Sequence, residues 1–243
     1  MLENLKLENI LVLDIETVPA APDYQSLDDR WKALWDKKAK FLVDEDQTSE
    51  EVYGRAGIYA EFGRIVCVSV GVYYHQGGEL HFKIKSFYGH DEHELLTNFC
   101  NLLNANFTSP QKALCGHNGK EFDFPFLARR ILTNGLKLPY LLNTAGKKPW
   151  EVNHLDTMQL WKFGDFKSYT SLDLLAALFD IPTPKDDIDG SMVYDIYYKE
   201  NDLERIRKYC QKDIITLANI LLRFKGMPIL QDAHIQITNP DNE

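Results

Sequence analysis

The 243-residue sequence has no apolar run long enough to span a membrane as a helix, for which about 18 residues are needed. Its first residues, MLENLKLENI, lack the basic start, apolar middle and small-residue cleavage site of a signal peptide. Only four cysteines are present, and no two of them form a Cys-x-x-Cys pair. This scatter disfavours a zinc site or a disulfide framework, and a reducing cytoplasm is the expected location.

The sequence also lacks an excess of basic residues. Its net charge of −9 argues against a protein that coats DNA non-specifically. Residues 124–170 nevertheless carry seven Lys/Arg against three acids, a local charge of +4 that leaves −13 for the rest. Two interpretations stay open, a basic patch for nucleic acid and ordinary surface variation. Individually, Lys162, Lys167 and Lys185 are typical of solvated surface, although each could meet a phosphate.

Hydrophobic patterning predicts one α/β domain over residues 1–226, with a mixed sheet flanked by helices on both faces. Residues 8–16 read as a strand, and residues 64–88 read as a hairpin around Gly77-Gly78. Short strands and helices alternate after the hairpin, and an apolar stripe marks a long helix over 202–225. Two segments differ: residues 20–60 form a charged helical insertion, and residues 227–243 are expected to be an irregular tail.

Two carboxylates interrupt the first strand. In LVLDIETVPA, Asp14 and Glu16 stand one residue apart and therefore point to the same face. An ordinary strand end that reaches solvent is one interpretation. However, Ile15 and Val18 indicate a strand that is buried on at least one side. Two like charges about 4 Å apart repel by about 4 kcal/mol at an effective dielectric near 20. A protonated acid or a bound cation would relieve this repulsion.

Two further acidic positions lie far along the chain. In RKYCQKDIITLANI, Tyr209 and Asp213 are separated by one helical turn and share a face. In GHNGKEFDFPFL, Asp123 precedes a helix start, where an acid is also a common N-cap. Each motif alone also fits an ordinary structural role. Together they form an ordered set of carboxylates at three places in the sequence.

This ordered set resembles the DEDD superfamily of 3′–5′ exonucleases. Within it, the chain is similar to the predicted exonucleases related to the proofreading domain of family-B DNA polymerases. The resemblance runs from LVLDIET to YCQKDIITLANILLRF, about residues 8–225, and includes HLDTMQLW and SLDLLAALFDIP. The histidine branch of the superfamily carries His five residues before the last Asp, where this chain has Lys208. Tyr209, four residues before Asp213, instead implies the tyrosine-bearing branch, DEDDy.

The resemblance implies a ribonuclease-H-like fold and a site for two divalent cations, Mg²⁺ or Mn²⁺. Asp14, Glu16, Asp123 and Asp213 are the implied metal ligands, and Tyr209 is the fifth implied catalytic residue, which would orient the attacking water. Thr17 and Asn118 are the implied substrate-binding residues. The histidines His117 and His154 are expected to be structural, and Asp156 is expected to cap or support rather than to bind metal.

The expected activity is that of a stand-alone 3′–5′ exonuclease, with single-stranded DNA as the expected substrate and nucleoside 5′-monophosphates as products. No polymerase domain fits in the remaining residues, so proofreading within this chain is not expected. Three alternatives stay open: an exoribonuclease, a non-catalytic nucleic-acid-binding protein on the same fold, and a metal phosphoesterase acting on small nucleotides. The sequence does not reveal the oligomeric state.

Overall fold

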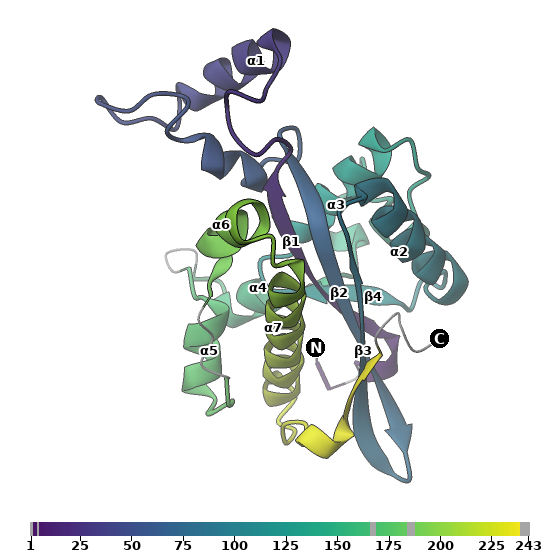
Figure 1. Cartoon of the computed structure of the whole chain (residues 1–243). Coiled ribbons are helices and arrows are strands. Elements are labelled where there is room, and N and C mark those ends of the chain that lie inside the picture. The colour runs from purple at the N-terminus through teal and green to yellow at the C-terminus, as the bar shows by residue number, and fades with distance from the viewer. Residues whose placement is uncertain (1, 4, 166–168, 184–187, 239–243) are drawn as a thin grey trace.

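The computed structural model describes residues 2–3, 5–165, 169–183 and 188–238. At its centre lies a six-stranded sheet with the strand order β5-β4-β1-β2-β3-β6 (Figure 1). Strands β1, β2 and β3 pair antiparallel, whereas β4, β5 and β6 join the sheet in parallel pairs. The strands are β1 (Ile10–Pro19), β2 (Gly63–Gln76), β3 (Glu79–Tyr88), β4 (Ala113–Gly116), β5 (Leu155–Asp156) and β6 (Ile235–Thr238).

Helices cover both faces of this sheet, with α2 and α3 on one side and α7 on the other (Figure 1). The predicted α/β arrangement, a mixed sheet with helices on both faces, is therefore confirmed. The helices are α1 (Asp29–Ala39), α2 (Glu92–Asn106), α3 (Asp123–Thr133), α4 (Thr157–Lys162), α5 (Leu172–Leu178), α6 (Val193–Asp195) and α7 (Leu203–Phe224). Shorter helical turns are η1 (Leu7–Asn9), η2 (Tyr53–Ile58), η3 (Tyr140–Leu142), η4 (Pro149–Glu151), η5 (Gly190–Met192), η6 (Ile196–Glu200, π-helical) and η7 (Asp232–His234).

Strand β1 is buried on both faces because it lies between β2 and β4 and beneath helices on either side. Leu11 and Leu13 pack with α2 and α3 in one apolar cluster, while Ile10 and Val12 pack with α7 in another. Strand side chains alternate between the faces, so every second residue of β1 is directed at α7. The strand carries mostly apolar residues for this reason. The side chains at its even-numbered positions are the ones that face α7.

A β-bulge interrupts the pairing of β1 with β2 between Glu16 and Thr17. Glu16 lies opposite Cys67, but Thr17 lies opposite Ile65, so Val66 is the extra residue on β2. A bulge increases local twist and bends the strand that carries it. Consistent with this, Val66 and Cys67 are consecutive yet belong to the same apolar cluster.

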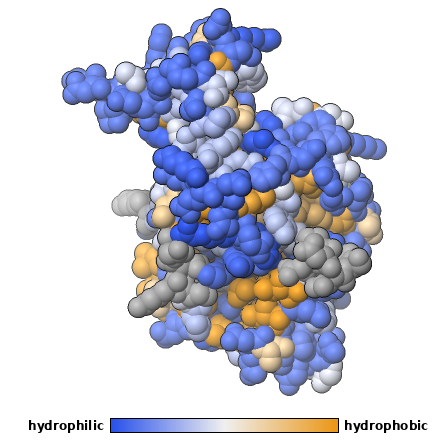
Figure 2. Space-filling model, in the orientation of Figure 1, coloured by the Kyte–Doolittle hydropathy of each residue, from blue (hydrophilic) through white to orange (hydrophobic). Residues whose placement is uncertain are grey.

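The predicted insertion has a small core of its own. Trp35 of α1 is fully buried, and its ring packs edge-on against Tyr53 and Phe62 at centroid distances of 5.4 Å and 5.3 Å. Its indole N–H donates to the Ser49 carbonyl at 2.7 Å. The insertion projects beyond the end of the sheet, and its visible face is mostly hydrophilic (Figures 1 and 2). Its last turn, η2, packs against β1.

The expectation of an irregular tail over residues 227–243 is wrong for its described part. Residues Ile235–Thr238 form β6, which pairs in parallel with β3 from Phe82 to Lys85. An unpaired sheet edge exposes backbone donors and acceptors, and β6 satisfies those of β3. A second difference is α4, which begins directly after the two-residue strand β5 because the Asp156 carboxylate caps it.

No helix among the described residues is long and apolar enough to cross a membrane. All four cysteines are buried and free. Lys167 and Lys185 lie outside the described residues.

Candidate active site

Strand β1 directs its two acids toward helix α7. Because Val12 packs on the α7 face, Asp14 and Glu16 point to that face as well. Asp14 is partly buried and Glu16 is buried, so neither is an ordinary strand-end acid in water. Asp14 and Glu16 therefore share the α7 face of a buried strand, as their spacing in the sequence indicates.

Helix α7 contributes Tyr209, Cys210 and Asp213 to the same place. The Cys210 thiol lies 3.4 Å from Asp14 Oδ2 and 3.6 Å from the Asp14 carbonyl oxygen. Tyr209 and Asp213 are one turn apart, and the Asp213 carboxylate lies near enough to the Tyr209 phenol to raise its pKa. The first strand and the last helix, almost 200 residues apart in sequence at Asp14 and Cys210, therefore meet here.

Asp123 reaches the site from a third element. It is the first residue of α3 and is 4% exposed. Its Oδ1 accepts a hydrogen bond of 3.2 Å from the backbone N–H of Ile15, the residue between Asp14 and Glu16. The alternative role as an N-cap does not apply, because Phe122 occupies that position.

The acids disfavour one another's ionisation. Burial, the largest cause, raises the pKa values of Asp14 and Glu16 well above the ordinary range. The charges of Asp123 and Asp213 raise that of Asp14 further, and those of Asp14 and Asp213 act likewise on Glu16. Burial also raises the pKa of Asp123 to about 7. Such a cluster is stabilised by protons or by cations.

Most of the expected site residues surround one cavity of about 560 Å³. Its lining includes Asp14, Glu16, Thr17, Tyr209 and Asp213. Asp123 is not among the lining residues, but its carboxylate bonds to the Ile15 N–H and its charge acts on Asp14. Thus the structure gathers all four acids and the tyrosine.

Asn118 takes a different position. It adopts φ of 61°, and its N–H donates to Asp156 Oδ1 at 3.1 Å. Its side-chain oxygen accepts from the Tyr169 hydroxyl at 3.1 Å. Among the described residues it does not line the acid cavity, although its carbonyl accepts the N–H of Phe122, which does.

The donor set fits divalent cations that prefer oxygen. Ligand atoms of Asp14, Glu16 and Cys210 all lie within 4.8 Å of one another. Carboxylates suit Mg²⁺ or Mn²⁺, whereas a thiolate suits softer metals. Burial raises the pKa of the Cys210 thiol well above its usual value, so the thiol remains protonated. It therefore fits as a donor to Asp14, while the carboxylates fit as ligands.

Cys210 was not among the site residues expected from the sequence. Its role was readable from its position, because it lies three residues before Asp213 and so shares a face with it.

The insertion and the η5–α6 region also reach the cavity, which the sequence did not indicate. Arg55 and Ile58 of η2 and Tyr194 of α6 are among its lining residues. Ile58 is 51% exposed. The insertion thus supplies a cation and an apolar side chain beside the acids.

The histidines and Asp156 have structural partners, as expected. His117 bonds to Thr157 Oγ1 and the Thr170 carbonyl, and His154 bonds to the Leu114 N–H and the Leu141 carbonyl. The Asp156 carboxylate accepts backbone N–H groups from two elements, the loop after β4 and the first turn of α4.

Three solved structures illustrate the likeness to known proteins. The family B DNA polymerase of the hyperthermophilic archaeon Pyrobaculum calidifontis is 18% identical, with a TM-score of 0.47, over 88% of this chain and 24% of the polymerase. A product-bound exonuclease I is 11% identical, with a TM-score of 0.41, over 88% of this chain and 47% of its own. An ExoI/SSB-Ct complex is 11% identical, with a TM-score of 0.40, over 88% of this chain and 44% of the matched chain. The chain thus spans less than half of each.

A comparison with curated protein sequences gives no match. One family, described as a predicted 3′–5′ exonuclease related to the exonuclease domain of PolB, matches residues 58–234, more than half of the chain. The matched span contains Asp123, Tyr209 and Asp213, while Asp14 and Glu16 precede it. The predicted enzyme class is thereby confirmed, and the chain belongs to the family of predicted 3′–5′ exonucleases related to the PolB exonuclease domain.

Proposed function

We propose that the chain is a metal-dependent 3′–5′ exonuclease that removes nucleotides one at a time from single-stranded DNA. The observation that carries this proposal is the convergence of Asp14, Glu16, Asp123 and Asp213 from three separate elements around one cavity. A cluster of buried acids that raise one another's pKa is costly for a fold unless it serves a charge-binding role. Phosphodiester hydrolysis with divalent cations is such a role.

The four carboxylates are proposed to hold two divalent cations. Asp14, Glu16, Asp123 and Asp213 would be the ligands that hold these ions. When bound, the ions would lower the pKa of water and neutralise charge on the attacking and leaving oxygens. The chain's own task is to fix these carboxylates. Cys210 would do so by donating to Asp14, and the Ile15 N–H by donating to Asp123.

Tyr209 is proposed to orient the attacking water. Burial, with the charges of Asp213 and Glu16, raises the pKa of this phenol far above its usual value. The phenol therefore keeps its proton at neutral pH and acts as a hydrogen-bond donor rather than as a base.

The proposed reaction is an in-line displacement at the last phosphodiester. Water attacks phosphorus, the bond from phosphorus to the 3′ oxygen of the preceding nucleotide breaks, and a nucleoside 5′-monophosphate leaves. Thr17, beside the bulge and in the cavity wall, would contact the terminal nucleotide. Arg55, in the same wall, would meet a phosphate oxygen. Asn118, held by Asp156 and Tyr169, would shape the adjoining loop and the path of the strand.

The choice of DNA rests on the family relationship to a DNA polymerase domain. The test is incubation of 5′-labelled single-stranded DNA and RNA oligomers with Mn²⁺ or with EDTA. A ladder of DNA products shortened from the 3′ end, absent with EDTA, is expected. Faster loss of RNA would make the enzyme an exoribonuclease, and shortening from the 5′ end would overturn the proposal.

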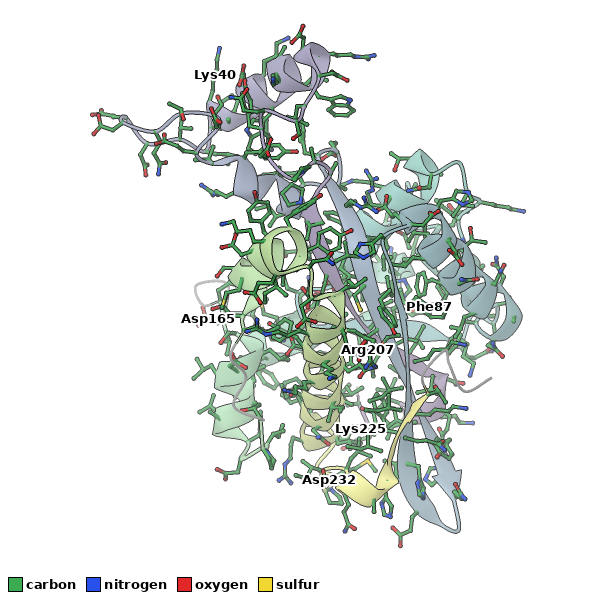
Figure 3. All side chains as sticks on the ribbon, viewed as in Figure 1. Lys40, Phe87, Asp165, Arg207, Lys225 and Asp232 are labelled. Atoms are coloured by element: carbon green, nitrogen blue, oxygen red, sulfur yellow. The ribbon has the colours of Figure 1, made fainter. Side chains whose placement is uncertain are left out.

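A matched pair of variants connects this activity to the acid cavity. Asp213→Asn should abolish the ladder. Asp232→Asn, an exposed acid beyond the far end of α7, should leave it unchanged (Figure 3). Equal activity of the two variants would show that a contaminant or another site is responsible.

A further inference from the structure

Two exposed aromatic side chains, Phe163 and Tyr169, lie between helices α4 and α5 in the sequence. Phe163 is 90% exposed and Tyr169 is 69% exposed. Phe163 ends α4 in the left-handed region, at φ 43° and ψ 32°, which is uncommon for a bulky side chain. Gly164 follows at φ 90°. The backbone therefore holds a large apolar ring mostly in water, with an edge contact to Trp161 at a centroid distance of 6.5 Å.

Positive charge accompanies these rings. The Lys162 ammonium lies 5.4 Å from the centre of the Tyr169 ring. The surrounding segment, residues 124–170, has a formal charge of +4 in a chain of −9. Flat aromatic faces interleaved with cations are the usual means of binding a single strand without reading its sequence.

A second cavity, of about 760 Å³, lies at the C-terminal end of α7. Its walls include the rings of Trp161, Phe179 and Phe224, and Trp161 stacks on Phe224 at a centroid distance of 6.1 Å and an interplanar angle of 9°. Arg223 also lines it. The Nε of Arg223 is buried and has no hydrogen-bond partner within the described part of the chain. A buried donor of this kind is costly unless an acceptor is supplied.

The two cavities are linked by contacts. Phe122 lines the acid cavity and bonds to Asn118, whose side chain bonds to Tyr169. From Tyr169 the contacts pass to Lys162, and the next residue, Phe163, lines the second cavity. Along α7, the ten residues from Asp213 to Arg223 correspond to about 15 Å. Figure 3 shows Lys225 at this end of the helix, well separated from Arg207 near its start.

We propose that these groups form a strand-binding track for single-stranded nucleic acid. The track consists of Tyr169, Lys162 and Phe163 and ends in the cavity of Trp161 and Arg223. It rests on the proposed function, because it places the 3′ end in the acid cavity and upstream nucleotides on the track. Bases stack on Phe163 and Tyr169, and the guanidinium of Arg223, a residue that lines the second cavity, meets an upstream phosphate. Short substrates that end before Phe163 do not use it.

The first test measures binding without cleavage. The full chain in EDTA is titrated against 5′-fluorescein DNA of about 15 nucleotides, a length within the range of single-strand sites, by fluorescence anisotropy. Combined Phe163→Ala and Tyr169→Ala changes should weaken binding by about tenfold or more, because each stacked base contributes on that order. Arg223→Gln should weaken it less. Phe41→Ala removes an equally exposed ring, 86% exposed, from the projecting insertion and should change nothing.

The second test compares cleavage of a trinucleotide and of the longer strand. Phe163→Ala should lose kcat/KM on the long strand and keep it on the trinucleotide, with an unchanged melting temperature. Equal losses on both substrates, or unchanged anisotropy, would overturn the track. Wild-type binding that depends on Phe163 without any hydrolysis would sink the proposed function and leave the track standing. A protein partner displaced by Phe163→Ala while DNA affinity stays constant would identify a protein-docking surface instead.

Discussion

The Cys210 thiol lies 3.4 Å from Oδ2 of Asp14, although 196 residues separate them in sequence. Asp14 is one of the four proposed metal ligands, so the group that fixes its rotamer would affect metal binding. Mutation of a residue that hydrogen-bonds to a metal ligand commonly lowers metal affinity by about 10–100-fold.

Removal of this donor is expected to weaken metal activation. Cys210→Ala should raise the Mn²⁺ concentration for half-maximal activity by about tenfold, the low end of that range, because a thiol is a weak donor. Cys210→Ser keeps a donor and should restore most of the affinity. Metal titrations of the hydrolysis rate check this. Equal half-saturation in all three proteins would show that Asp14 is oriented without the thiol.

Neutralising one acid should stabilise the metal-free fold while it abolishes activity. Burial raises the pKa of Asp14, so its ionised form is disfavoured in the folded state at pH 7. Asp14→Asn removes that charge, and a gain of about 0.5–2 kcal/mol in the free energy of unfolding is expected. Denaturant unfolding with EDTA measures it. Mn²⁺ should raise the melting temperature of the wild type but not of Asp14→Asn; a matching rise in both would place the ions elsewhere.

Loss of the Tyr209 hydroxyl should slow the chemical step. Tyr209→Phe keeps the ring packed against its neighbours and removes one hydrogen bond to the site, so kcat should fall by about tenfold with little change in KM. Because the pKa of Tyr209 is raised, no loss of wild-type activity is expected from its ionisation up to about pH 10. Single-turnover rates across pH provide the measurement. An unchanged Tyr209→Phe rate would remove the residue from the mechanism.

Protonation of His154 should remove stability in mild acid, against an opposite contribution from Asp123, whose raised pKa of about 7 adds stability as pH falls over the same range. Burial lowers the pKa of His154 to about 4, and its Nδ1 must stay unprotonated to accept from the Leu114 N–H. The unfolded state, with a pKa near 6.5, takes up the proton first, so this stability is present above about pH 6.5 and is lost as pH falls toward 4. Between pH 7 and 5 the loss should be about 2 kcal/mol. His117, whose pKa burial also lowers, adds to the trend.

Denaturant midpoints at several pH values measure this loss. His154→Gln should remove about 2 kcal/mol of this loss between pH 7 and 5, whereas His75→Gln, at an exposed position, should leave the pH dependence as in the wild type. The same pH dependence in the wild type and in His154→Gln would contradict the interpretation.

Much of the architecture was readable because local patterns and tertiary structure agree. The hairpin around Gly77-Gly78 and the apolar stripe of α7 specify their elements through turn chemistry and periodicity. The acids of β1 and α7 could be paired only through the resemblance to a family, since no spacing rule joins residues so distant in sequence. The structure then brings Asp14 and Asp213 together, and the family model covers the second of them.

Other features were not readable because they depend on which surfaces meet. Strand β6 is only four residues long, and its pairing depends on the free edge of β3. Likewise, the charged composition of residues 20–60 predicts a solvated helix but says nothing about where η2 docks. Arg55 and Ile58 reach the cavity only because η2 packs on β1.

The extra residue Val66 divides the antiparallel pairing of β1 with β2 into two stretches that differ in register by one residue. Before it, the pairing of β2 with the end of β1 fixes where the insertion starts; after it, the pairing fixes the height of Asp14 and Glu16. Insertions or deletions upstream of Val66 can therefore reposition the projecting lobe while the carboxylates keep their registration. The projecting lobe, which contributes Arg55 and Ile58 to the cavity, is thus free to change while the acid positions of β1 stay the same.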